Sequence, residues 1–441
     1  MTEFDNIIIG SGPGGYKLAA ALAAKGESTA VVERSFPGGT CLNRGCIPTK
    51  CLCATASAMS AAKYADHMGV KVDILGFDYR VAASRKDAVV EQLRGGVLAV
   101  IKNCTLINGS ARLMPGRVIE VSGELYKAAR RLVIATGSAP ATLPVDGAEL
   151  ALSSDDALAF TSLPQSIIII GGGVIGMEFA SMYNVMGADV TVVEYCSEIL
   201  PPFDAEIAKR LRTALTRRGV NIITNACVES ITRQIDQDMF TVHYTGKRGE
   251  AEISASTVLM AVGRQPVIPD GCREAGITLT SRGFIAVDDM MRTTADGVYA
   301  IGDVNGLSML AHSAIAQGHV IEHDNSTLFN TDATPSVVFT IPEVAQVGPT
   351  SAQLTARNIP HRTIKRTYGS VGKALAEGFD GLVKIIVTDD SESRIIGISI
   401  LGPHAADLIA EATILTTDKV PFAEVATRYI HAHPTLSEIF C

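Results

Sequence analysis

The 441-residue sequence lacks an excess of positive charge and lacks a long uninterrupted apolar run. Its 38 lysines and arginines face 46 aspartates and glutamates, which gives a net charge of −8. This balance argues against nucleic acid or an anionic membrane surface as the main partner. The most apolar stretch, Ile167 to Met177, contains three consecutive glycines and is shorter than the ~18 residues that a spanning helix needs. We therefore predict a soluble protein without a nucleic-acid or membrane partner.

We also expect no leader peptide, and the sequence lacks a dense cysteine framework. A strand-like run, Asp5 to Ile9, begins within a few residues of Met1, so we expect no signal or transit peptide and a cytoplasmic protein. The nine cysteines are an odd number spread thinly over a long chain, unlike the framework of a secreted domain. We predict no metal site. Seven cysteines are expected to be mostly inert, namely Cys51, Cys53, Cys104, Cys196, Cys227, Cys272 and Cys441.

Two glycine-rich turns repeat one pattern, each between a strand-like apolar run and a helix-like segment. The first turn leads from Gly10 to an acid at Glu33, and the second leads from Gly171 to Glu194. Both intervals are 23 residues (33 − 10 and 194 − 171), and the pattern recurs at an offset of 161 (171 − 10). Glycines let the backbone approach a pyrophosphate, the helix N-terminus faces its charge, and the acid accepts from ribose hydroxyls. The repeat predicts two dinucleotide sites, made by Gly10, Gly12, Gly15 and Glu33 and by Gly171, Gly173, Gly176 and Glu194.

Glu194 also bears on which nicotinamide cofactor binds. A carboxylate about 4 Å from a 2′-phosphate costs about 4 kcal/mol per charge pair at an effective dielectric constant near 20, which is nearly three decades in affinity. No arginine lies within the next several residues to offset this repulsion. We therefore predict NAD rather than NADP in the second site.

Cys41 and Cys46 lie in the segment Gly38 to Lys50, directly downstream of the first glycine turn. Residues five apart on a regular helix are roughly 7.5 Å apart along its axis, whereas the Cα atoms of a disulfide lie about 4.4–6.8 Å apart. A bond here must distort the helix, and Gly45 and Pro48 let the backbone accept that distortion. Because strained or exposed disulfides tend to be labile, we interpret the two cysteines as a reversible redox pair. The alternative is two structural thiols that merely lie close together.

Taken together, these elements resemble the pyridine nucleotide-disulfide oxidoreductases, and among them the dihydrolipoyl dehydrogenases. The similarity runs nearly from end to end. Besides the cysteine segment, it rests on the motifs Ala135–Ser138, Ala261–Arg264, Tyr299–Asp303, Met309–His312 and His431–Glu438. Two features depart from the family pattern: Ser313 stands where a basic residue is common, and the sequence stops at Cys441 where many relatives continue.

The resemblance implies FAD in the first site and NAD in the second. It places Lys50 near the flavin ring, with Glu178 as its acidic partner, and Asp303 against ribityl or phosphate-linked groups of the flavin. Without the family, the alternatives are a surface lysine for Lys50, a solvated acid for Glu178 and simply the end of a strand for Asp303. The predicted cofactor-binding residues are completed by Thr136, Gly137, Ala311 and Gly263.

A base is needed because a dithiol substrate is mostly protonated at neutral pH, whereas exchange requires a thiolate. His433 is followed by Pro434 and, five residues later, by Glu438, whose carboxylate would fix the ring tautomer and stabilise the imidazolium. We predict His433 as the base and leave His431 unassigned. Without the motif, this His-x-His would equally be a tail or an incidental metal binder. The resemblance implies that His433 reaches the cysteines of the other subunit, in a homodimer whose active sites are shared.

The predicted fold class is α/β, with two Rossmann-like domains that bind FAD and NAD and a C-terminal α+β dimerisation domain. The expected boundaries are 1–140 for the FAD domain with the redox helix, 141–265 for the NAD domain, 266–332 for a return to the FAD domain, and 333–441 for the interface domain. In this last domain, apolar runs at Leu382–Val387 and Ile395–Ile400 predict antiparallel strands, and Ala405–Thr417 reads as a helix.

The implied reaction is flavin-dependent oxidation of dihydrolipoamide, or of protein-bound dihydrolipoyl groups, with reduction of NAD⁺ to NADH. In it Cys41 is the interchange thiol and Cys46 gives the thiolate that faces the flavin. The implied partner is a lipoylated carrier of a 2-oxoacid dehydrogenase or glycine cleavage complex. Two alternatives remain open: an NAD(P)H-dependent reductase of another small disulfide or a metal ion, and a catalytically silent flavoprotein that serves as a docking subunit.

Overall fold

A computed structural model describes residues 1–234, 236, 238–323 and 328–441. The predicted range 266–332 thus includes 324–327, which lie outside the described residues. The chain divides into two compact units. The first comprises Met1–Cys51, Arg80–Ala141 and Arg264–Thr331, and the second comprises Leu52–Tyr79, Thr142–Gly263 and Asp332–Cys441. No helix in the described ranges is long and apolar enough to cross a bilayer.

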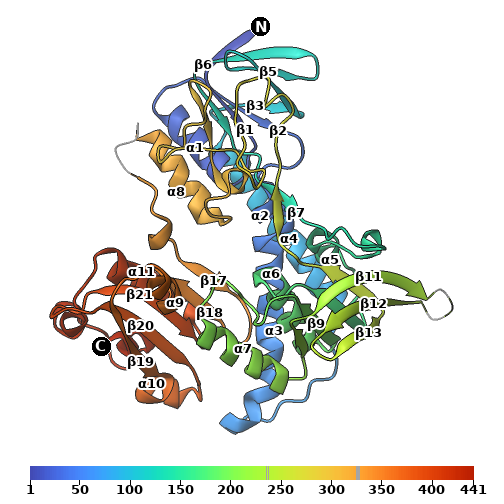
Figure 1. The fold of residues 1–441 in the computed structure, drawn as a ribbon, viewed down its shortest axis with the longest axis vertical. Coiled ribbons are helices and arrows are strands. Elements are labelled where there is room, and N and C mark those ends of the chain that lie inside the picture. The colour runs from blue at the N-terminus through green and yellow to red at the C-terminus, as the bar shows by residue number, and fades with distance from the viewer. Residues whose placement is uncertain (235, 237, 324–327) are drawn as a thin grey trace. The chain divides into compact units, whose positions relative to one another are not determined.

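The first unit is built on a seven-stranded sheet of order β3-β2-β1-β6-β5-β4, with β16 also paired to β6 (Figure 1). The strands β1, β2, β3, β6 and β16 run parallel, and β4 and β5 are antiparallel. The strands of the first unit are β1 (Thr2–Ile9), β2 (Thr29–Glu33), β3 (Thr105–Asn108), β4 (Ala111–Met114), β5 (Val118–Val121), β6 (Glu124–Ile134) and β16 (Val298–Ala300) in this sheet, and β7 (Ser138–Pro140) and β15 (Arg264–Pro266) outside it. Its helices are α1 (Pro13–Ala24), α2 (Gly39–Arg44), α4 (Tyr79–Val100) and α8 (Ala311–Glu322), together with the start of α3 (Cys46–Tyr64).

The apolar run that opens the chain forms the centre of this sheet. Ile7, Ile8 and Ile9 of β1 are at most 4% exposed, as expected for a parallel strand covered on both faces. Helix α1 begins at Pro13, where the missing N–H costs nothing. It packs closely on α8, since a Cβ at Gly14 would lie 2.7 Å from the carbonyl oxygen of Ala314.

The second unit contains a four-stranded parallel sheet of order β10-β9-β8-β14 and a three-stranded antiparallel sheet, β11-β12-β13 (Figure 1). The predicted strand Ile167–Ile170 lies inside β8, and each of its isoleucines is at most 2% exposed. The strands are β8 (Ser166–Ile170), β9 (Asp189–Glu194), β10 (Asn221–Thr224), β11 (Cys227–Gln234), β12 (Met239–Gly246), β13 (Gly249–Ala255) and β14 (Thr257–Met260). The helices are α5 (Ser154–Leu158), α6 (Val174–Met186) and α7 (Ala205–Arg217).

The same unit ends in a five-stranded antiparallel sheet of order β17-β18-β21-β20-β19. The two predicted antiparallel strands and the predicted helix are confirmed as β20, β21 and α11. The strands are β17 (Ser336–Val338), β18 (Val344–Val347), β19 (His361–Thr367), β20 (Leu382–Thr388) and β21 (Ile395–Leu401). The helices are α9 (Ser351–Ala356), α10 (Gly372–Ala376), α11 (Ala405–Thr417) and α12 (Val425–Arg428), followed by the 3₁₀ turn η8 (Leu436–Phe440).

Candidate active site

The first glycine turn joins β1 to α1 and is closed by contacts that exclude a side chain. Gly10 has a φ of +104°, and a Cβ there would lie 2.3 Å from the carbonyl oxygen of Ala135. The Glu33 carboxylate, at the end of β2, accepts hydrogen bonds from the N–H (3.0 Å) and Oγ (2.6 Å) of Ser11. It also accepts from the N–H of Ser35 (2.8 Å). The predicted acid therefore holds the backbone of the turn in place.

The second turn, between β8 and α6, repeats this geometry at the same offset. Gly171 has a φ of +109°, and a Cβ there would lie 2.4 Å from the carbonyl oxygen of Ala261. The Glu194 carboxylate accepts from the N–H groups of Gly172 (2.5 Å) and Cys196 (2.6 Å). Each partner of Glu194 lies 161 residues after the corresponding partner of Glu33. The sequence repeat is thus a repeat of backbone contacts as well.

Both turns leave an open space in front of a helix N-terminus. Gly12 and Gly173 are the N-cap residues of α1 and α6. Among the residues that the structure describes, no side chain caps either helix, and a Cβ at either glycine would have no heavy atom within 4 Å. At Gly15 and Gly176, by contrast, a Cβ would lie 2.0 Å from the carbonyl oxygen of the first glycine of the turn. The N–H groups and positive dipole end of a helix bind phosphate oxygens. The residues present therefore fit a dinucleotide at each turn.

The cysteine segment lies directly on the first glycine turn. Helix α2 carries the first cysteine and α3 begins at the second. The N–H of Gly38 donates to the carbonyl oxygen of Ser11 (3.0 Å). A Cβ at Gly39, where φ is +62°, would lie 2.7 Å from the Cα of Gly12. The dithiol is therefore held beside the turn at which the family resemblance implies FAD.

Within this segment the two thiols interact. Gly45 is the C-cap residue of α2, and a Cβ there would lie 3.0 Å from the carbonyl oxygen of Thr40. The pKa of the half-buried Cys41 is raised far above its ordinary value by a hydrogen bond with Cys46, by burial and by repulsion from the Cys46 charge, while the Lys50 charge opposes the rise. The two thiols are therefore close enough to interact directly, as a redox pair requires.

Asn43, between the cysteines, is a positioning residue that the sequence did not single out. Its side-chain amide donates to the carbonyl oxygens of Phe36 (3.3 Å), Pro37 (3.1 Å) and Gly39 (2.9 Å). Its Oδ1 accepts from Nε of Arg94 on α4 (3.1 Å), and the Arg94 guanidinium lies 4.1 Å from the centre of the Phe36 ring. The loop before Cys41 is therefore fixed by a helix far away in sequence.

A second network surrounds Asp303. Its Oδ2 accepts from Oγ of Ser138 (2.5 Å), and Nε of Arg264 lies 3.8 Å from the same oxygen. Arg264 also donates to Oγ (2.6 Å) and to the carbonyl oxygen (2.8 Å) of Ser138. In the adjacent loop, Oγ1 of Thr136 donates to the carbonyl oxygen of Val267 (2.5 Å). The motifs around residues 136, 264 and 303 thus meet in the first unit.

The other predicted cofactor residues have separate surroundings. Gly137 has a φ of +70°, and Ala311 is the first residue of α8. Gly263, with a φ of +116°, is exposed between β14 and β15. Glu178 is only 4% exposed and accepts from the N–H of Phe339 (2.9 Å), so it is not a solvated glutamate. Lys50 belongs to the first unit and Glu178 to the second, and their pairing stays a prediction.

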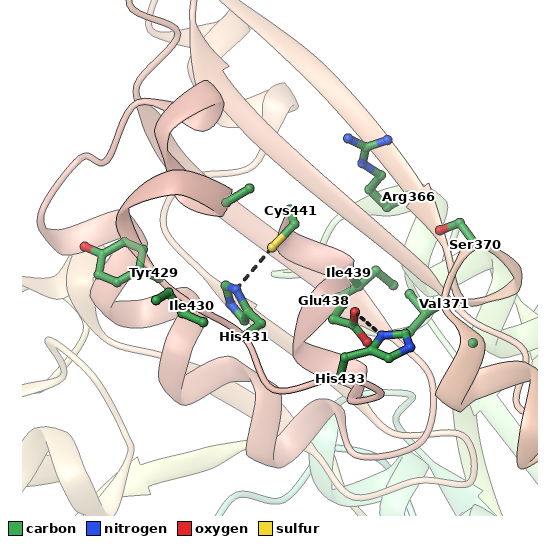
Figure 2. A pocket seen from close by; sticks show the side chains of 12 residues that line it. Arg366, Ser370, Val371, Tyr429, Ile430, His431, His433, Glu438, Ile439 and Cys441 are labelled. Carbon is green, nitrogen blue, oxygen red and sulfur yellow. Dashed lines mark hydrogen bonds and ion pairs between the residues drawn. The ribbon is translucent and has the colours of Figure 1, made fainter.

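The predicted base lines a cavity of 540 Å³ in the second unit (Figure 2). Nδ1 of His433 lies 2.8 Å from Oε1 of Glu438, and Oε2 of Glu438 accepts from the N–H of Thr435 (2.9 Å). The hydrogen bond from His433, followed by that from Thr435, lowers the pKa of Glu438. The imidazole side chain is 78% exposed, and its Nε2 has no hydrogen-bond partner in the described ranges. The ring is thus oriented by a carboxylate, with Nε2 available to take a proton.

His431, which lines the same cavity, belongs to a second histidine–carboxylate pair that the sequence did not predict. Its Nε2 lies 2.5 Å from Oε1 of Glu411. Its Nδ1 lies 3.1 Å from Sγ of Cys441, which also lines the cavity (Figure 2). Among the other cysteines, Cys51, Cys53 and Cys272 are buried, in keeping with an inert role.

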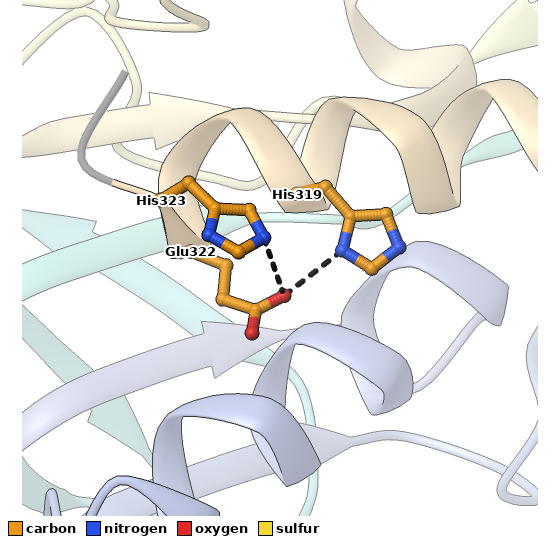
Figure 3. A group of neighbouring side chains, drawn as sticks. All are labelled: His319, Glu322 and His323. Carbon is orange, nitrogen blue, oxygen red and sulfur yellow. Dashed lines mark hydrogen bonds and ion pairs between the residues drawn. The ribbon is translucent and has the colours of Figure 1, made fainter. Parts of the chain in front are cut away.

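His319, Glu322 and His323 form a group of possible metal ligands near the end of α8 (Figure 3). Their ligand atoms lie within 4.8 Å of one another, at a spacing of i, i+3, i+4 that the sequence interpretation missed. Nδ1 of His319 lies 2.9 Å from Oε2 of Glu322, and the ammonium of Lys25 lies 3.8 Å from Oε1. Histidines in a last turn interact favourably with the helix dipole, and Lys25 already offsets the Glu322 charge. We therefore assign no cation to this group.

Two family models match the sequence. The model described as pyridine nucleotide-disulphide oxidoreductase matches residues 4–318, and the dimerisation domain of the same family matches residues 334–441. The chain belongs to the pyridine nucleotide-disulphide oxidoreductase family. The predicted fold class is confirmed, and FAD and NAD, predicted for the two turns, are the cofactors of this family.

Individual relatives resemble the chain over its whole length. It is 36% identical to a dihydrolipoyl dehydrogenase of Chlamydia pneumoniae, over 99% of this chain and 95% of the relative. It is 37% identical to one of Bacillus subtilis strain 168, over 99% and 96% of the two chains. Among solved structures, it is similar to the HOCl-induced flavoprotein disulfide reductase RclA of Escherichia coli, with a TM-score of 0.87 and 30% identity, over 99% of this chain and 98% of that one. The predicted resemblance is thus confirmed.

Proposed function

We propose that the protein oxidises dihydrolipoamide groups to lipoamide and transfers the electrons to NAD⁺. The observation that carries this proposal is the Cys41–Cys46 pair. Its thiols are hydrogen bonded, and the segment that carries them packs on the first glycine turn. Full-length similarity to dihydrolipoyl dehydrogenases supports the choice of substrate.

The proposed cycle is a pair of thiol–disulfide exchanges. Nε2 of His433 takes the proton of a substrate thiol, and the thiolate attacks Cys41, which breaks the Cys41–Cys46 bond and leaves Cys46 as a thiolate. The second substrate thiol then attacks the mixed disulfide and releases Cys41, which takes up a proton. The raised pKa of Cys41 suits this final protonation. Bound at the first glycine turn, FAD would supply an acceptor for the two electrons of the dithiol, and NAD⁺ at the second turn would supply their final acceptor as a hydride.

An anaerobic titration of the holoenzyme tests this function. Adding NADH should bleach the flavin and produce long-wavelength absorbance from the Cys46 thiolate, and adding lipoamide should restore the starting spectrum. NADPH in parallel should act far more weakly. A protein that binds FAD but shows no thiol-dependent reduction of NAD⁺ would instead be the silent docking subunit.

A second candidate is a reductase that works in the opposite direction. The similarity to RclA, a flavoprotein disulfide reductase that has also been solved as a Cu(II) complex, favours this reading. In that case, NADH oxidation would be faster with another small disulfide or with Cu(II) than NAD⁺ reduction is with dihydrolipoamide. Comparing these rates under one set of conditions decides between the two.

We also propose a homodimer in which each active site takes its cysteines from one subunit and His433 from the other. The match of residues 334–441 to the family's dimerisation domain supports this arrangement. So do the 78% exposed His433 side chain and Ile430, an apolar residue that lines the same cavity and is 99% exposed. Burial of such an isoleucine against a second copy would be favourable.

Co-assembly of two inactive variants tests the shared site. A dimer of one Cys41→Ser chain and one His433→Gln chain keeps one intact cysteine–histidine combination only if the site is shared. Random co-assembly should therefore restore about a quarter of the parent activity, since half of the dimers are mixed and each has one working site. No recovery in isolated mixed dimers would place both groups in one chain.

The glycine turns predict a contrast between two neighbouring alanine variants. Gly12→Ala should leave unfolding of the flavin-free protein unchanged but lower the flavin bound per chain, because its Cβ enters the open space before α1. Gly10→Ala should destabilise the flavin-free protein by at least about 1–3 kcal/mol, the usual cost of a strained backbone. Thermal unfolding and flavin absorbance measure the two effects. Normal flavin content in Gly12→Ala would contradict the proposal that a cofactor phosphate binds in front of α1.

Glu194 should determine the preference for NAD(H) over NADP(H). We expect the parent enzyme to use NADPH roughly 10³-fold less efficiently than NADH, from the repulsion between carboxylate and 2′-phosphate. Glu194→Gln should narrow this gap by at least about 10-fold, since the amide is uncharged. The ratio of kcat/KM for the two cofactors measures the change, with the exposed Glu229→Gln as control. An unaltered ratio in Glu194→Gln would show that another residue determines the preference for NAD(H) over NADP(H).

We further propose that the enzyme acts in the cytoplasm on the lipoylated carrier of a 2-oxoacid dehydrogenase or glycine cleavage complex. The names of the bacterial relatives support a lipoyl substrate. Comparing kcat/KM for free dihydrolipoamide and for purified lipoylated carrier domains would identify the preferred partner.

A further inference from the structure

Cys441, His431 and Glu411 form a hydrogen-bonded chain, with His431 in the middle, that the proposed reaction does not use. Nδ1 of His431 faces Sγ of Cys441 at 3.1 Å, and Nε2 faces Oε1 of Glu411 at 2.5 Å. Glu411 lies on α11, 20 residues before His431, and the His431 side chain is 9% exposed. The ring is therefore held between thiol and carboxylate, whereas the ligands of a metal would converge on one point.

This order of groups is that of an activated nucleophile. A thiol is activated when a base within hydrogen-bond reach can take its proton, and the base works best when a third group fixes its ring. Glu411 supplies that third group, because a carboxylate on Nε2 stabilises the imidazolium formed when Nδ1 accepts the Cys441 proton.

The surroundings of Cys441 favour attack only when His431 assists. Burial, followed by the charges of Glu411 and Glu438, raises the pKa of Cys441, and the charge of Arg366 opposes this rise. Without a base, Cys441 would thus react more slowly than an ordinary exposed thiol. With a base, the thiolate formed during attack is a strong nucleophile, because nucleophilicity rises with thiol pKa.

In the single chain, Cys441 is also accessible from a space large enough for a small molecule. It is exposed and lines the 540 Å³ cavity, together with His431, His433 and Ile430 (Figure 2). A group attached to Cys441 would therefore occupy the cavity that the proposed base lines.

We propose that Cys441, with His431 as base and Glu411 as its orienting group, is a site of reversible modification by low-molecular-mass disulfides. The Cys441 thiol gives its proton to Nδ1 of His431, and its sulfur attacks one sulfur of R–S–S–R. A Cys441–S–S–R bond forms, the S–S bond of the reagent breaks, and the departing RS⁻ takes the proton from His431. One cysteine is oxidised, one RS group is reduced, and the number of disulfides is unchanged.

The modification would switch off dihydrolipoamide oxidation by filling the cavity around His433. This consequence rests on the proposed function, whereas the chemistry of Cys441 does not. A small disulfide would accumulate under oxidising conditions, and a small thiol would remove the adduct by the reverse exchange.

The first experiment follows the oxidised holoenzyme with glutathione disulfide as the probe. Intact mass and peptide mapping should show one glutathionyl group per chain, on Cys441, removed by dithiothreitol and absent in Cys441→Ser. A glutathionyl group on other cysteines only would overturn the proposal. The adduct is read by mass, so this result is independent of whether dihydrolipoamide is the substrate. Loss of dihydrolipoamide turnover in step with the adduct, and its recovery with dithiothreitol, would show the switch.

The second experiment measures the base. With iodoacetamide at neutral pH, Cys441 should react on the order of 10²-fold faster than Cys227, an exposed thiol whose Sγ has only a 3.9 Å contact to a carbonyl oxygen among the described residues. His431→Gln and the milder Glu411→Gln should remove this advantage, whereas His319→Gln, a histidine–glutamate pair elsewhere, should keep it. Equal rates for Cys441 and Cys227, or unchanged rates in both His431→Gln and Glu411→Gln, would overturn the proposal.

Discussion

Replacing Cys41 with serine is expected to lower dihydrolipoamide-dependent NAD⁺ reduction by on the order of 10⁴-fold or more, the scale on which loss of a nucleophile acts in covalent enzymes. The reason is that a hydroxyl can neither form the Cys41–Cys46 bond nor accept the substrate sulfur. The rate of NADH formation with free dihydrolipoamide measures the effect.

Two controls separate lost chemistry from lost structure. Flavin content of Cys41→Ser should match the parent, because the glycine turn and its Glu33 hydrogen bonds remain. Its thermal unfolding should match that of the reduced parent, in which the Cys41–Cys46 bond is also open. Cys227→Ser, which changes an exposed cysteine in the second unit, should keep full activity. Substantial dithiol oxidation by Cys41→Ser would mean that the electrons do not pass through this pair.

The second large effect is expected for His433→Gln. Loss of a general base should reduce turnover with dihydrolipoamide by about 10²–10⁴-fold. Reduction of the bound flavin by NADH should be nearly unchanged, because that half of the cycle does not need a proton taken from the substrate dithiol. Steady-state turnover and rapid-mixing measurements of flavin absorbance give the two rates.

The comparison of the two half-reactions makes the assignment specific. His319→Gln is a suitable control, since His319 also lies beside a glutamate, at 2.9 Å, yet outside this cavity. Equal losses in both half-reactions of His433→Gln would indicate a general structural defect and refute the role of base.

Local patterns in the sequence were sufficient for the two glycine turns. A strand, a turn and a helix are adjacent along the chain, so positions 161 residues apart have the same local structure. Gly10 and Gly171 both have a positive φ, and Glu33 and Glu194 accept hydrogen bonds from corresponding backbone N–H groups. The bounds of α11 could be predicted for the same reason, since an uninterrupted helix depends mainly on its own residues.

Contacts between distant segments could not be predicted in this way. Arg94 meets Asn43 across 51 residues, and Ser138 meets Asp303 across 165 residues. Glu411 and Cys441 approach His431 only because α11 and the end of the chain pack on one sheet. No spacing rule indicates such pairs, since their separation depends on the path of the loops between them. A single histidine, lysine or acid therefore had several interpretations until its neighbours were known.

The hydrogen bonds of Asn43 have a consequence for how the enzyme changes between its oxidised and reduced states. Three carbonyl groups before Cys41 are tied to one amide, and that amide is tied to α4, so the main chain of the loop has little freedom. Opening and closing the sulfur–sulfur bond then involves rotation about two Cα–Cβ bonds rather than rearrangement of a loop. The oxidised and reduced enzymes should consequently share one backbone, and the loop should show equal amide hydrogen exchange in both redox states.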